Sequence, residues 1–219
     1  MRVRQVECEQ ENNVKLNYFI DSNKGITFLV IFGMMAYYHQ WNNPTAWVYL
    51  ALHGTYGILW VMKTYLFPDA NWIRPTPLWF GIVSWLALVL YWIPAWLVMS
   101  RGVQAPLWLL AVCISMYTFG IFFVYAGDMQ KFTTLKLRPN ELITDGMFRL
   151  SRNINYFGEF LIYAAFALLP MVWYAFLPLA AFIVTFWIPN MVRKDKILAT
   201  LPGFQEYKKK VRSFFPFIF

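Results

Sequence analysis

Long apolar runs separated by short polar loops fill most of the chain. Six runs are visible, at residues 26–40, 44–67, 78–100, 105–130, 155–169 and 171–192. A helix needs about 20 apolar residues to cross the hydrocarbon layer of a bilayer. The first and fifth runs are short, so we expect them to begin or end among the lipid headgroups. The pattern predicts an all-α, polytopic membrane bundle of six transmembrane helices, with tolerated kinks at Pro94, Pro178 and Pro189.

Basic residues lie on one side of this six-crossing topology. They include Lys15 and Lys24 before the first run, the loops near Lys63 and after Lys131, and the C-terminal tail, whereas Arg101 alone falls on the opposite side. Because basic residues in short loops face the cytosol, both termini are predicted to be cytosolic. Residues 1–25 are then a cytosolic N-terminal segment without the apolar stretch of a signal peptide, and residues 26–219 form a single membrane domain.

Composition supports an integral membrane protein. Hydrophobic residues make up 59% of the 219 residues and charged residues only 14%, against about 25% charged in soluble domains. The net charge of +8 could indicate nucleic acid. However, the basic residues adjoin the apolar runs, so we expect no nucleic acid and a cytosolic face against the anionic headgroups of the lipid bilayer. Bacterial inner, endoplasmic reticulum and other organelle membranes all fit, and no metal site is expected.

The segment 127–159 gathers polar residues that suit a phosphate-bearing cofactor. Its candidate binding residues are Asp128, Lys131, Lys136, Arg138, Arg152, Asn155 and Tyr156. Cations match phosphate charge, and an Asn amide can pair with a base. An ordinary loop that binds lipid headgroups has the same composition, so the residue types leave both readings open.

Glu159 adds a carboxylate about one turn inside the fifth run. A charge at that depth is costly and usually functional. The alternative is an ion pair with Arg152 or Arg193 that joins the helix ends.

The C-terminal tail predicts a basic helix at the membrane interface. After a Pro202-Gly203 turn, apolar residues recur at helical spacing with basic residues between them; they are Phe204, Tyr207, Val211, Phe214 and Phe215. We expect this apolar stripe to enter the headgroup layer and anchor the C-terminus.

Several of these residues together resemble the C-terminal domain of the steroid 5-alpha-reductase family, in the superfamily of sterol reductases and isoprenylcysteine methyltransferases. The matching pieces are Asp128, Gly146-Met147-Phe148, the string NYFGE at 155–159, Glu206-Tyr207 and the closing PFIF. The resemblance implies a multi-helix membrane fold that holds NADPH in a cytosol-facing cavity within residues 127–219. Hydride would then pass to an activated double bond of a hydrophobic lipid substrate, such as an enone steroid.

The resemblance also implies individual roles. By position, Asp128, Asn155 and Glu159 would line the cofactor pocket, and Arg193 corresponds to an Arg that contacts the cofactor in that family. Tyr156 and Tyr207 belong to the matching pieces. The four cations Lys131, Lys136, Arg138 and Arg152 are added on charge alone.

Methyltransferases of the same superfamily bind S-adenosylmethionine in a similar place, which makes lipid or isoprenylcysteine methyl transfer the alternative function. Their pattern has Arg-His-Pro before the Tyr and two Glu residues after the last span. This chain has Arg152-Asn153-Ile154 and Lys194-Asp195 there, so both marks are missing and methyl transfer is disfavoured.

The N-terminal half departs from the reductases, which use a Glu and a Tyr of early helices to polarise the substrate carbonyl. The first two runs contain no Glu, but His53, Tyr56 and Trp60 share one face of the second. A Tyr hydroxyl supported by His could protonate or hold an enolate, so Tyr56 and His53 are the candidate catalytic residues. Hydrogen bonding between helices is the alternative role. A non-catalytic subunit of a membrane complex is a third reading of the chain.

Overall fold

The computed structural model describes residues 13–69 and 72–216. Those residues form seven continuous helical stretches that contain α-helix, one separate 3-10 turn and one short ribbon of two strands. Four of the stretches are long and apolar enough to cross a membrane: Leu16–Tyr37, Leu78–Ser100, Leu107–Leu137 and Trp173–Leu198. The all-α membrane fold is confirmed at this level, whereas six crossings and two cytosolic termini stay predictions.

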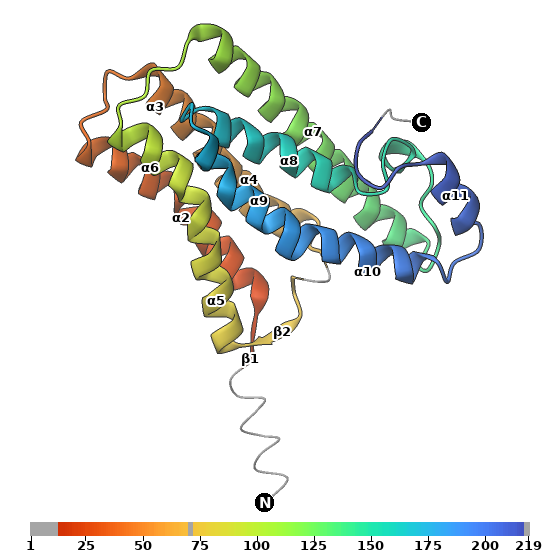
Figure 1. Ribbon diagram of the computed structural model, residues 1–219. Coiled ribbons are helices and arrows are strands. Elements are labelled where there is room, and N and C mark those ends of the chain that lie inside the picture. Colours follow the sequence, from red (N-terminus) through yellow and green to blue (C-terminus); the bar gives the residue numbers. More distant parts are fainter. Residues whose placement is uncertain (1–12, 70–71, 217–219) are drawn as a thin grey trace, which may run out of the picture. The chain divides into compact units, whose positions relative to one another are not determined.

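By its internal contacts the chain divides into two compact units, Met1–Gly102 and Val103–Phe219. Figure 1 shows the helices of both units with their labels. The cytosolic N-terminal segment expected at residues 1–25 and the cofactor-binding region expected within residues 127–219 stay predictions.

The first unit begins with β1 (Asn13–Lys15), which pairs antiparallel with β2 (Pro75–Pro77). Helix α2 (Leu16–Tyr37) follows at once. The prediction of a short first helix that begins at residue 26 is therefore wrong. Polar residues before residue 26 stay helical because their side chains bond inside the unit; Asp21, for example, accepts hydrogen bonds from Asn17 at 3.2 Å and Thr64 at 2.9 Å.

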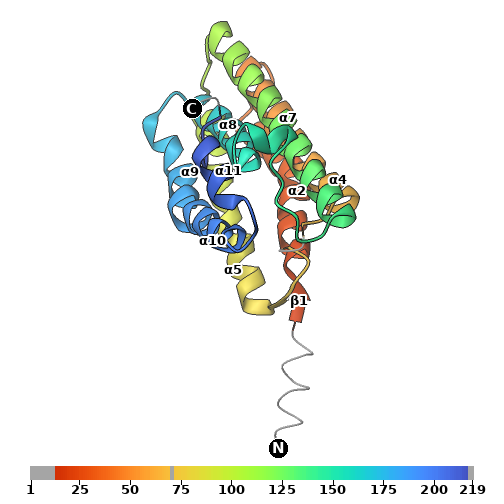
Figure 2. The ribbon, with the colours of Figure 1, turned by 90° about the vertical axis from the view of Figure 1, so that its right-hand side faces the viewer.

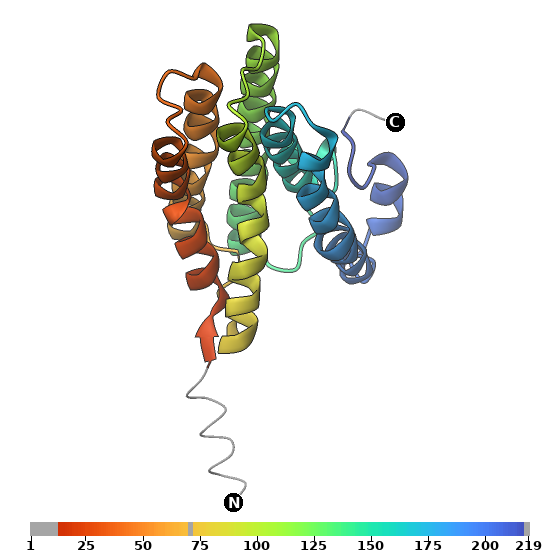
Figure 3. The same cartoon turned by 60° about the vertical axis from the view of Figure 1, so that its left-hand side comes forward.

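The second predicted run is one continuous helix, as expected. It consists of α3 (Pro44–Tyr49), the π-helical turn η1 (Leu50–Gly54) and α4 (Thr55–Leu66). Asn43 caps its start, because its Oδ1 accepts the Thr45 backbone N–H at 3.0 Å. Helices α5 (Leu78–Val89), η2 (Leu90–Trp92) and α6 (Ile93–Ser100) complete the unit, with α5 beside α2 (Figure 3).

The second unit is built on the contact of α7 (Leu107–Leu137) with α8 (Ile154–Leu168), joined through the 3-10 turn η3 (Gly146–Arg149). The helices approach closely because glycines face each other. A Cβ added at Gly158 would lie 2.7 Å from the Gly120 carbonyl oxygen, and one at Gly120 would lie 2.6 Å from the Ile162 side chain. Small residues that allow such approach are typical of helix contacts in membranes.

The remaining elements run from η4 (Trp173–Phe176) through α9 (Leu177–Phe182), η5 (Ile183–Trp187) and α10 (Ile188–Leu198) to α11 (Phe204–Lys210). Figure 2 shows α10 and α11 in blue beside each other. Pro94, Pro178 and Pro189 each lie in the first turn of a helix that directly follows a 3-10 or π turn, so the helical runs continue through these prolines, as predicted.

Large apolar side chains cover the outer faces of the long helices. Examples that are more than half exposed are Leu29, Leu86, Trp108, Phe119 and Val184. Apolar faces of this extent are disfavoured in water, so these helices indicate an integral membrane protein embedded in a lipid bilayer.

Helix α11 corrects one expectation. Phe204, Tyr207 and Val211 are buried in the second unit, in a small core that Leu142 and Leu198 extend. The predicted apolar stripe in the headgroup layer is therefore wrong for these three residues, because protein side chains cover them. Lys208, Lys209 and Lys210 remain exposed on the opposite face.

Candidate functional site

The second unit brings the start of α8 against the C-terminal part of α7, which the sequence predicts to face the cytosol and to bind the cofactor. A Cβ at Gly127 would lie 2.9 Å from the Ile154 side chain and 3.8 Å from the Asn155 backbone nitrogen. Asp128 follows Gly127 directly, so this close approach places Asp128 beside the first turn of α8. Asp128 and Asn155 both belong to the pieces that resemble the steroid 5-alpha-reductase family. They are distant in sequence but are neighbours in the fold.

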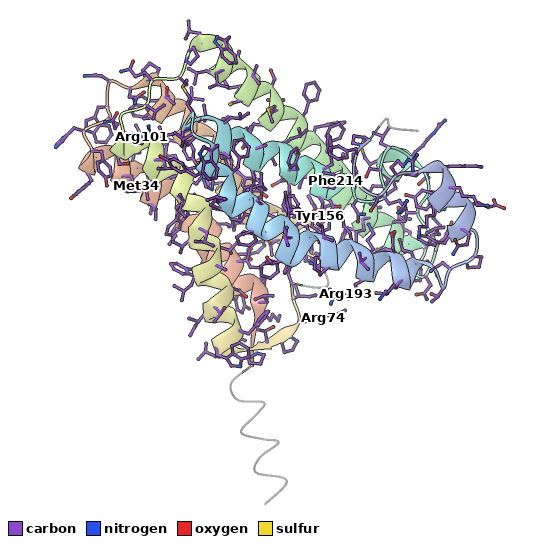
Figure 4. The ribbon with its side chains drawn as sticks, viewed as in Figure 1. Met34, Arg74, Arg101, Tyr156, Arg193 and Phe214 are labelled. Atoms are coloured by element: carbon purple, nitrogen blue, oxygen red, sulfur yellow. The ribbon has the colours of Figure 1, made fainter. Side chains whose placement is uncertain are left out.

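Asn155 and Glu159 lie on a common face of α8, since they are four residues apart. Ile154, Gly158 and Ile162 face α7. Tyr156 and Tyr163 face Trp187, with ring centroids 5.5 and 6.3 Å from it. By helical geometry the face with Asn155 and Glu159 lies between these two contacts, toward α7 and the last long helix. Figure 4 shows Tyr156 between α8 and α10.

Arg152 is held by an ion pair just before α8. Its Nη2 and Nε donate to the two carboxylate oxygens of Asp195 at 2.8 and 3.3 Å, and its Nη1 donates to the Val211 carbonyl. The two side chains are 6% and 19% exposed. A bidentate, largely buried pair of this kind is strong and geometrically specific. Three of the donors of Arg152 are therefore used inside the protein, and its cofactor role stays a prediction.

Around this pair, side chains bond the C-terminal segment to the start of α8. Lys194 Nζ donates to the Arg152 carbonyl at 2.6 Å and to Asn153 Oδ1 at 3.1 Å. Asn153 Nδ2 donates to the Ser213 carbonyl at 2.8 Å, and Ser151 Oγ donates to the Phe214 carbonyl at 2.9 Å. We call Ser151, Arg152, Asn153, Lys194 and Asp195 the tail latch, because together they hold residues 211–214.

The tail latch also lies near α7. The charges of Lys131, Asp195, Asp128 and Arg152 all act on the Lys194 ammonium. Five charged residues from three parts of the second unit thus form one cluster, three cations and two carboxylates. Lys194 and Asp195 were not among the predicted binding residues, although their place one turn after Met191 on the last long helix was visible in the sequence.

Other predicted residues do not join this cluster. Lys136 lies over the ring of Phe132 on its own helix at 5.8 Å, and Arg138 pairs with Glu141 at 2.9 Å on the exposed surface. Arg193 is exposed and donates to Asn190 at 3.2 Å. Figure 4 shows Arg193 on the side of α10 away from Tyr156. Their cofactor roles stay predictions without geometric support.

Tyr207 is buried, and its hydroxyl donates to the Phe148 carbonyl at 2.6 Å. We expect Tyr207→Phe to lower the free energy of unfolding by about 1–2 kcal/mol, because it leaves a buried carbonyl without its donor. Burial also raises the pKa of Tyr207. The wild type should therefore lose this stabilisation as the pH rises above the ordinary tyrosine pKa, and the Phe variant should lack that loss. Equilibrium unfolding in detergent at several pH values measures both, with the exposed Tyr65→Phe as control.

The first unit holds the candidate catalytic residues in its interior. His53 is 1% exposed and Tyr56 is fully buried. His53 lies in the π-helical turn η1, a feature frequent at functional sites. Its Nδ1 shares a 3.2 Å hydrogen bond with the Tyr49 hydroxyl. His53 and Tyr56 are thus polar groups inside the unit, while their catalytic roles stay predictions.

The same interior contains a residue that the sequence reasoning missed. Lys24 is 3% exposed, although it was assigned to a cytosolic segment. Its Nζ lies over the rings of Tyr56 at 5.0 Å, Trp60 at 5.4 Å and Tyr91 at 5.2 Å. Its charge also acts on His53. The signal that could have found it is the helical spacing of Asn17, Asp21, Lys24 and Thr27, which marks a polar stripe on one face of a helix.

An apolar groove of about 610 Å³ lies along α7 and α8 in the second unit. Its lining includes Val112, Phe119, Phe123, Phe157 and Leu161. Phe157 also contacts Phe214, with ring centroids 5.9 Å apart. The groove lies on the α8 face opposite Tyr156 and is suited to apolar chains.

The fold and the charged cluster define a polytopic, all-α membrane protein with a polar site at the end of an apolar helix bundle. The chain belongs to the DUF1295 family, described as proteins of unknown function, whose model matches residues 70–211. This is a membrane protein family related to the steroid 5-alpha-reductase-like superfamily. A search of curated proteins finds no significant match to the chain. The resemblance noted in the sequence is thus confirmed for the superfamily, and no specific activity follows from it.

Proposed function

We propose that this protein is an NADPH-dependent reductase that saturates an activated carbon–carbon double bond of a lipid. The observation that carries the proposal is the contact of α7 with α8 at Gly127, which makes Asp128 a neighbour of Asn155 at the charged cluster. Both residues belong to the pieces that resemble the steroid reductases, and membership of a related family supports the same reading.

The cluster has the chemistry that a dinucleotide phosphate requires. Lys131 and Lys194 bring positive charge to the end of α7 and α10. Asn155 offers an amide for base or nicotinamide recognition, and Tyr156 offers a ring stacked on Trp187. Glu159, on the same face of α8 as Asn155, can accept from ribose hydroxyls. Asp128 can do so from the neighbouring helix.

The proposed reaction is a hydride addition to a conjugated ketone. Bound NADPH would supply the hydride for the β-carbon and leave as NADP⁺, and the enolate of the lipid would take a proton at its α-carbon. Tyr56 and His53 stay the candidate catalytic residues that the sequence analysis named.

Binding of NADPH to purified protein in detergent tests the proposal. We expect saturable binding that weakens at least tenfold in Asn155→Ala and Glu159→Ala, since each removes a polar contact worth about 1.5–3 kcal/mol. Lys136→Ala is the matched control, because it removes an exposed cation outside the charged cluster. Isothermal titration calorimetry gives the affinities. Absence of NADPH binding by well-folded wild-type protein would end the proposal.

S-adenosylmethionine should be titrated against the same preparation. In the positions of the methyltransferase Glu pair this chain has Lys194 and Asp195, and both are engaged in the tail latch. We therefore expect no binding of S-adenosylmethionine. Tight binding of it in place of NADPH would select methyl transfer, and binding of neither would favour a structural subunit.

A further inference from the structure

The apolar groove along α7 and α8 is open along its length. Val112 is 42% exposed and Phe119 is 60% exposed, and the residues that line the groove all belong to the second unit. The lining runs along α7 from Ala111 to Phe123, which is about 18 Å at a rise of about 1.5 Å per residue. One leaflet of the hydrocarbon core is about 15 Å thick, half of about 30 Å. The groove therefore matches the length of one lipid acyl chain.

One end of the groove meets a turn that α7 holds in place. Gln130 lies about two turns beyond Phe123, on the same face of α7. Its Oε1 accepts the Met147 backbone N–H at 2.8 Å. Its Nε2 donates to the Asp145 carbonyl at 3.0 Å and to the Asp145 carboxylate at 3.1 Å. The turn η3 is therefore fixed at this end of the groove, and its last residue, Arg149, is exposed.

The C-terminal tail borders the same end of the groove on the α8 side. The ring of Phe157, which lines the groove, has its centroid 5.9 Å from that of Phe214. Just before α8, the Arg152 backbone N–H donates to the Arg212 carbonyl at 3.0 Å. Arg212 is exposed. A second exposed cation therefore lies at the end of the groove near η3.

These two arginines give the end of the groove a positive charge. Among the residues that the structure describes, no carboxylate forms an ion pair with Arg149 or Arg212. A guanidinium group matches the charge and the geometry of a phosphate. Basic groups beside membrane helices on the cytosolic side are typical of sites for anionic headgroups, and the topology predicted from the sequence places this end there.

We propose that the second unit binds one anionic phospholipid, with an acyl chain in the apolar groove and the phosphate on Arg149 and Arg212. A wholly apolar occupant, such as a helix of a second copy of the chain, would fill the groove but leave both cations without an anion. A phospholipid satisfies the apolar lining and the charge together. The site is independent of the proposed function, because its residues lie outside the charged cluster and on the α8 face opposite Tyr156.

Native mass spectrometry of the delipidated full chain in detergent tests this site. The probes are dioleoylphosphatidylglycerol, which is anionic, and dioleoylphosphatidylcholine, which has the same acyl chains on a zwitterionic headgroup. We expect the first phosphatidylglycerol to bind roughly tenfold more tightly than the first phosphatidylcholine, because two arginines face its net negative charge. Equal affinities would overturn the inference, and so would a dimer mass without bound lipid. This comparison requires no variant.

Variants of the two arginines then assign the preference. The double variant Arg149→Gln with Arg212→Gln should bind phosphatidylglycerol no more tightly than phosphatidylcholine. Lys136→Gln with Arg138→Gln is the matched control, because it removes the same charge from the exposed end of α7, and it should keep the preference. A folded double arginine variant that still prefers phosphatidylglycerol would overturn the inference.

A change inside the groove tests the place of the acyl chain. Ser115→Trp puts a large ring among the lining residues and should weaken the binding of both lipids at least fivefold. Ile114→Trp is its control, because Ile114 is 44% exposed on the same helix but does not line the groove. Wild-type affinity of Ser115→Trp for both lipids would refute the groove as the site. Loss of NADPH binding with intact lipid preference would refute the proposed function alone.

Discussion

Replacing Arg152 by methionine should lower the free energy of unfolding by about 3–5 kcal/mol, because the change leaves a partly buried carboxylate without its cation. Asp195 would lose two hydrogen bonds, and the Val211 carbonyl would lose its donor. The tail latch would therefore open, and residues 211–214 would leave the start of α8. Equilibrium unfolding in detergent measures the loss of stability, and the rate of tryptic cleavage at Lys208–Arg212 measures release of the tail.

Two controls separate this effect from a general loss of charge. Arg138→Ala removes an ion pair to Glu141 whose members are 54% and 49% exposed, and it should change stability by less than about 1 kcal/mol. The double variant Arg152→Met with Asp195→Leu should recover part of the loss, because it removes the unpaired charge. An Arg152→Met protein as stable and as protease-resistant as the wild type would show that the tail does not depend on the Arg152–Asp195 ion pair.

The pattern of apolar runs predicted most of the helices because a membrane span needs a long apolar stretch and little else. The helices at 44–66, Leu78–Ser100 and Trp173–Leu198 lie where the runs lie. The start of α2 was missed for the same reason. Asp21, Asn23 and Lys24 make residues 16–25 read as polar, yet their side chains face the inside of the unit, where other polar groups and rings accept them. Hydropathy averages over all faces of a helix, so it does not reveal that these polar side chains face the inside of the unit.

The sequence predicted several residues of the candidate site but not the contacts that join them. The resemblance singled out Asp128 and Asn155, and the fold makes them neighbours through Gly127. Charge alone could not distinguish Arg152, which bonds inside the protein, from Lys136, which is exposed, since both are cations of the segment 127–159. Asp195 was missed because an ion pair across 43 residues of sequence leaves no local signal.

The C-terminal tail shows a second limit of prediction from the sequence. Apolar residues at helical spacing between lysines predict an amphipathic helix but not the surface that its apolar face contacts. Phe204 and Tyr207 enter a protein core with Leu142, which comes from the loop before η3. A headgroup layer and a small protein core impose the same sequence pattern, so the distinction needs the tertiary fold.

Replacing Gly158 by leucine should disrupt the second unit more broadly than any change at its polar site. Even a Cβ at this position would lie 2.7 Å from the Gly120 carbonyl oxygen and 2.9 Å from Val124. Because the nearest atoms include backbone, α8 must move away from α7. Overpacking of this kind costs about 1–3 kcal/mol for added methylenes, and a backbone shift adds to it. We expect Gly158→Ala to lose about 2 kcal/mol of stability and Gly158→Leu to fail to yield monodisperse protein.

Separating α8 from α7 also separates Asn155 from Asp128, so Gly158→Ala should weaken NADPH binding although residue 158 offers no side chain to a ligand. Gly33→Ala is the matched control, because it adds the same methyl group to a membrane helix at a position where a Cβ meets nothing within 4 Å. It should leave both stability and binding near the wild-type values. Thermal unfolding and NADPH titration on the same preparations compare the two variants. If Gly158→Ala kept wild-type stability, the α7–α8 contact would not be the tight backbone approach that positions the charged cluster.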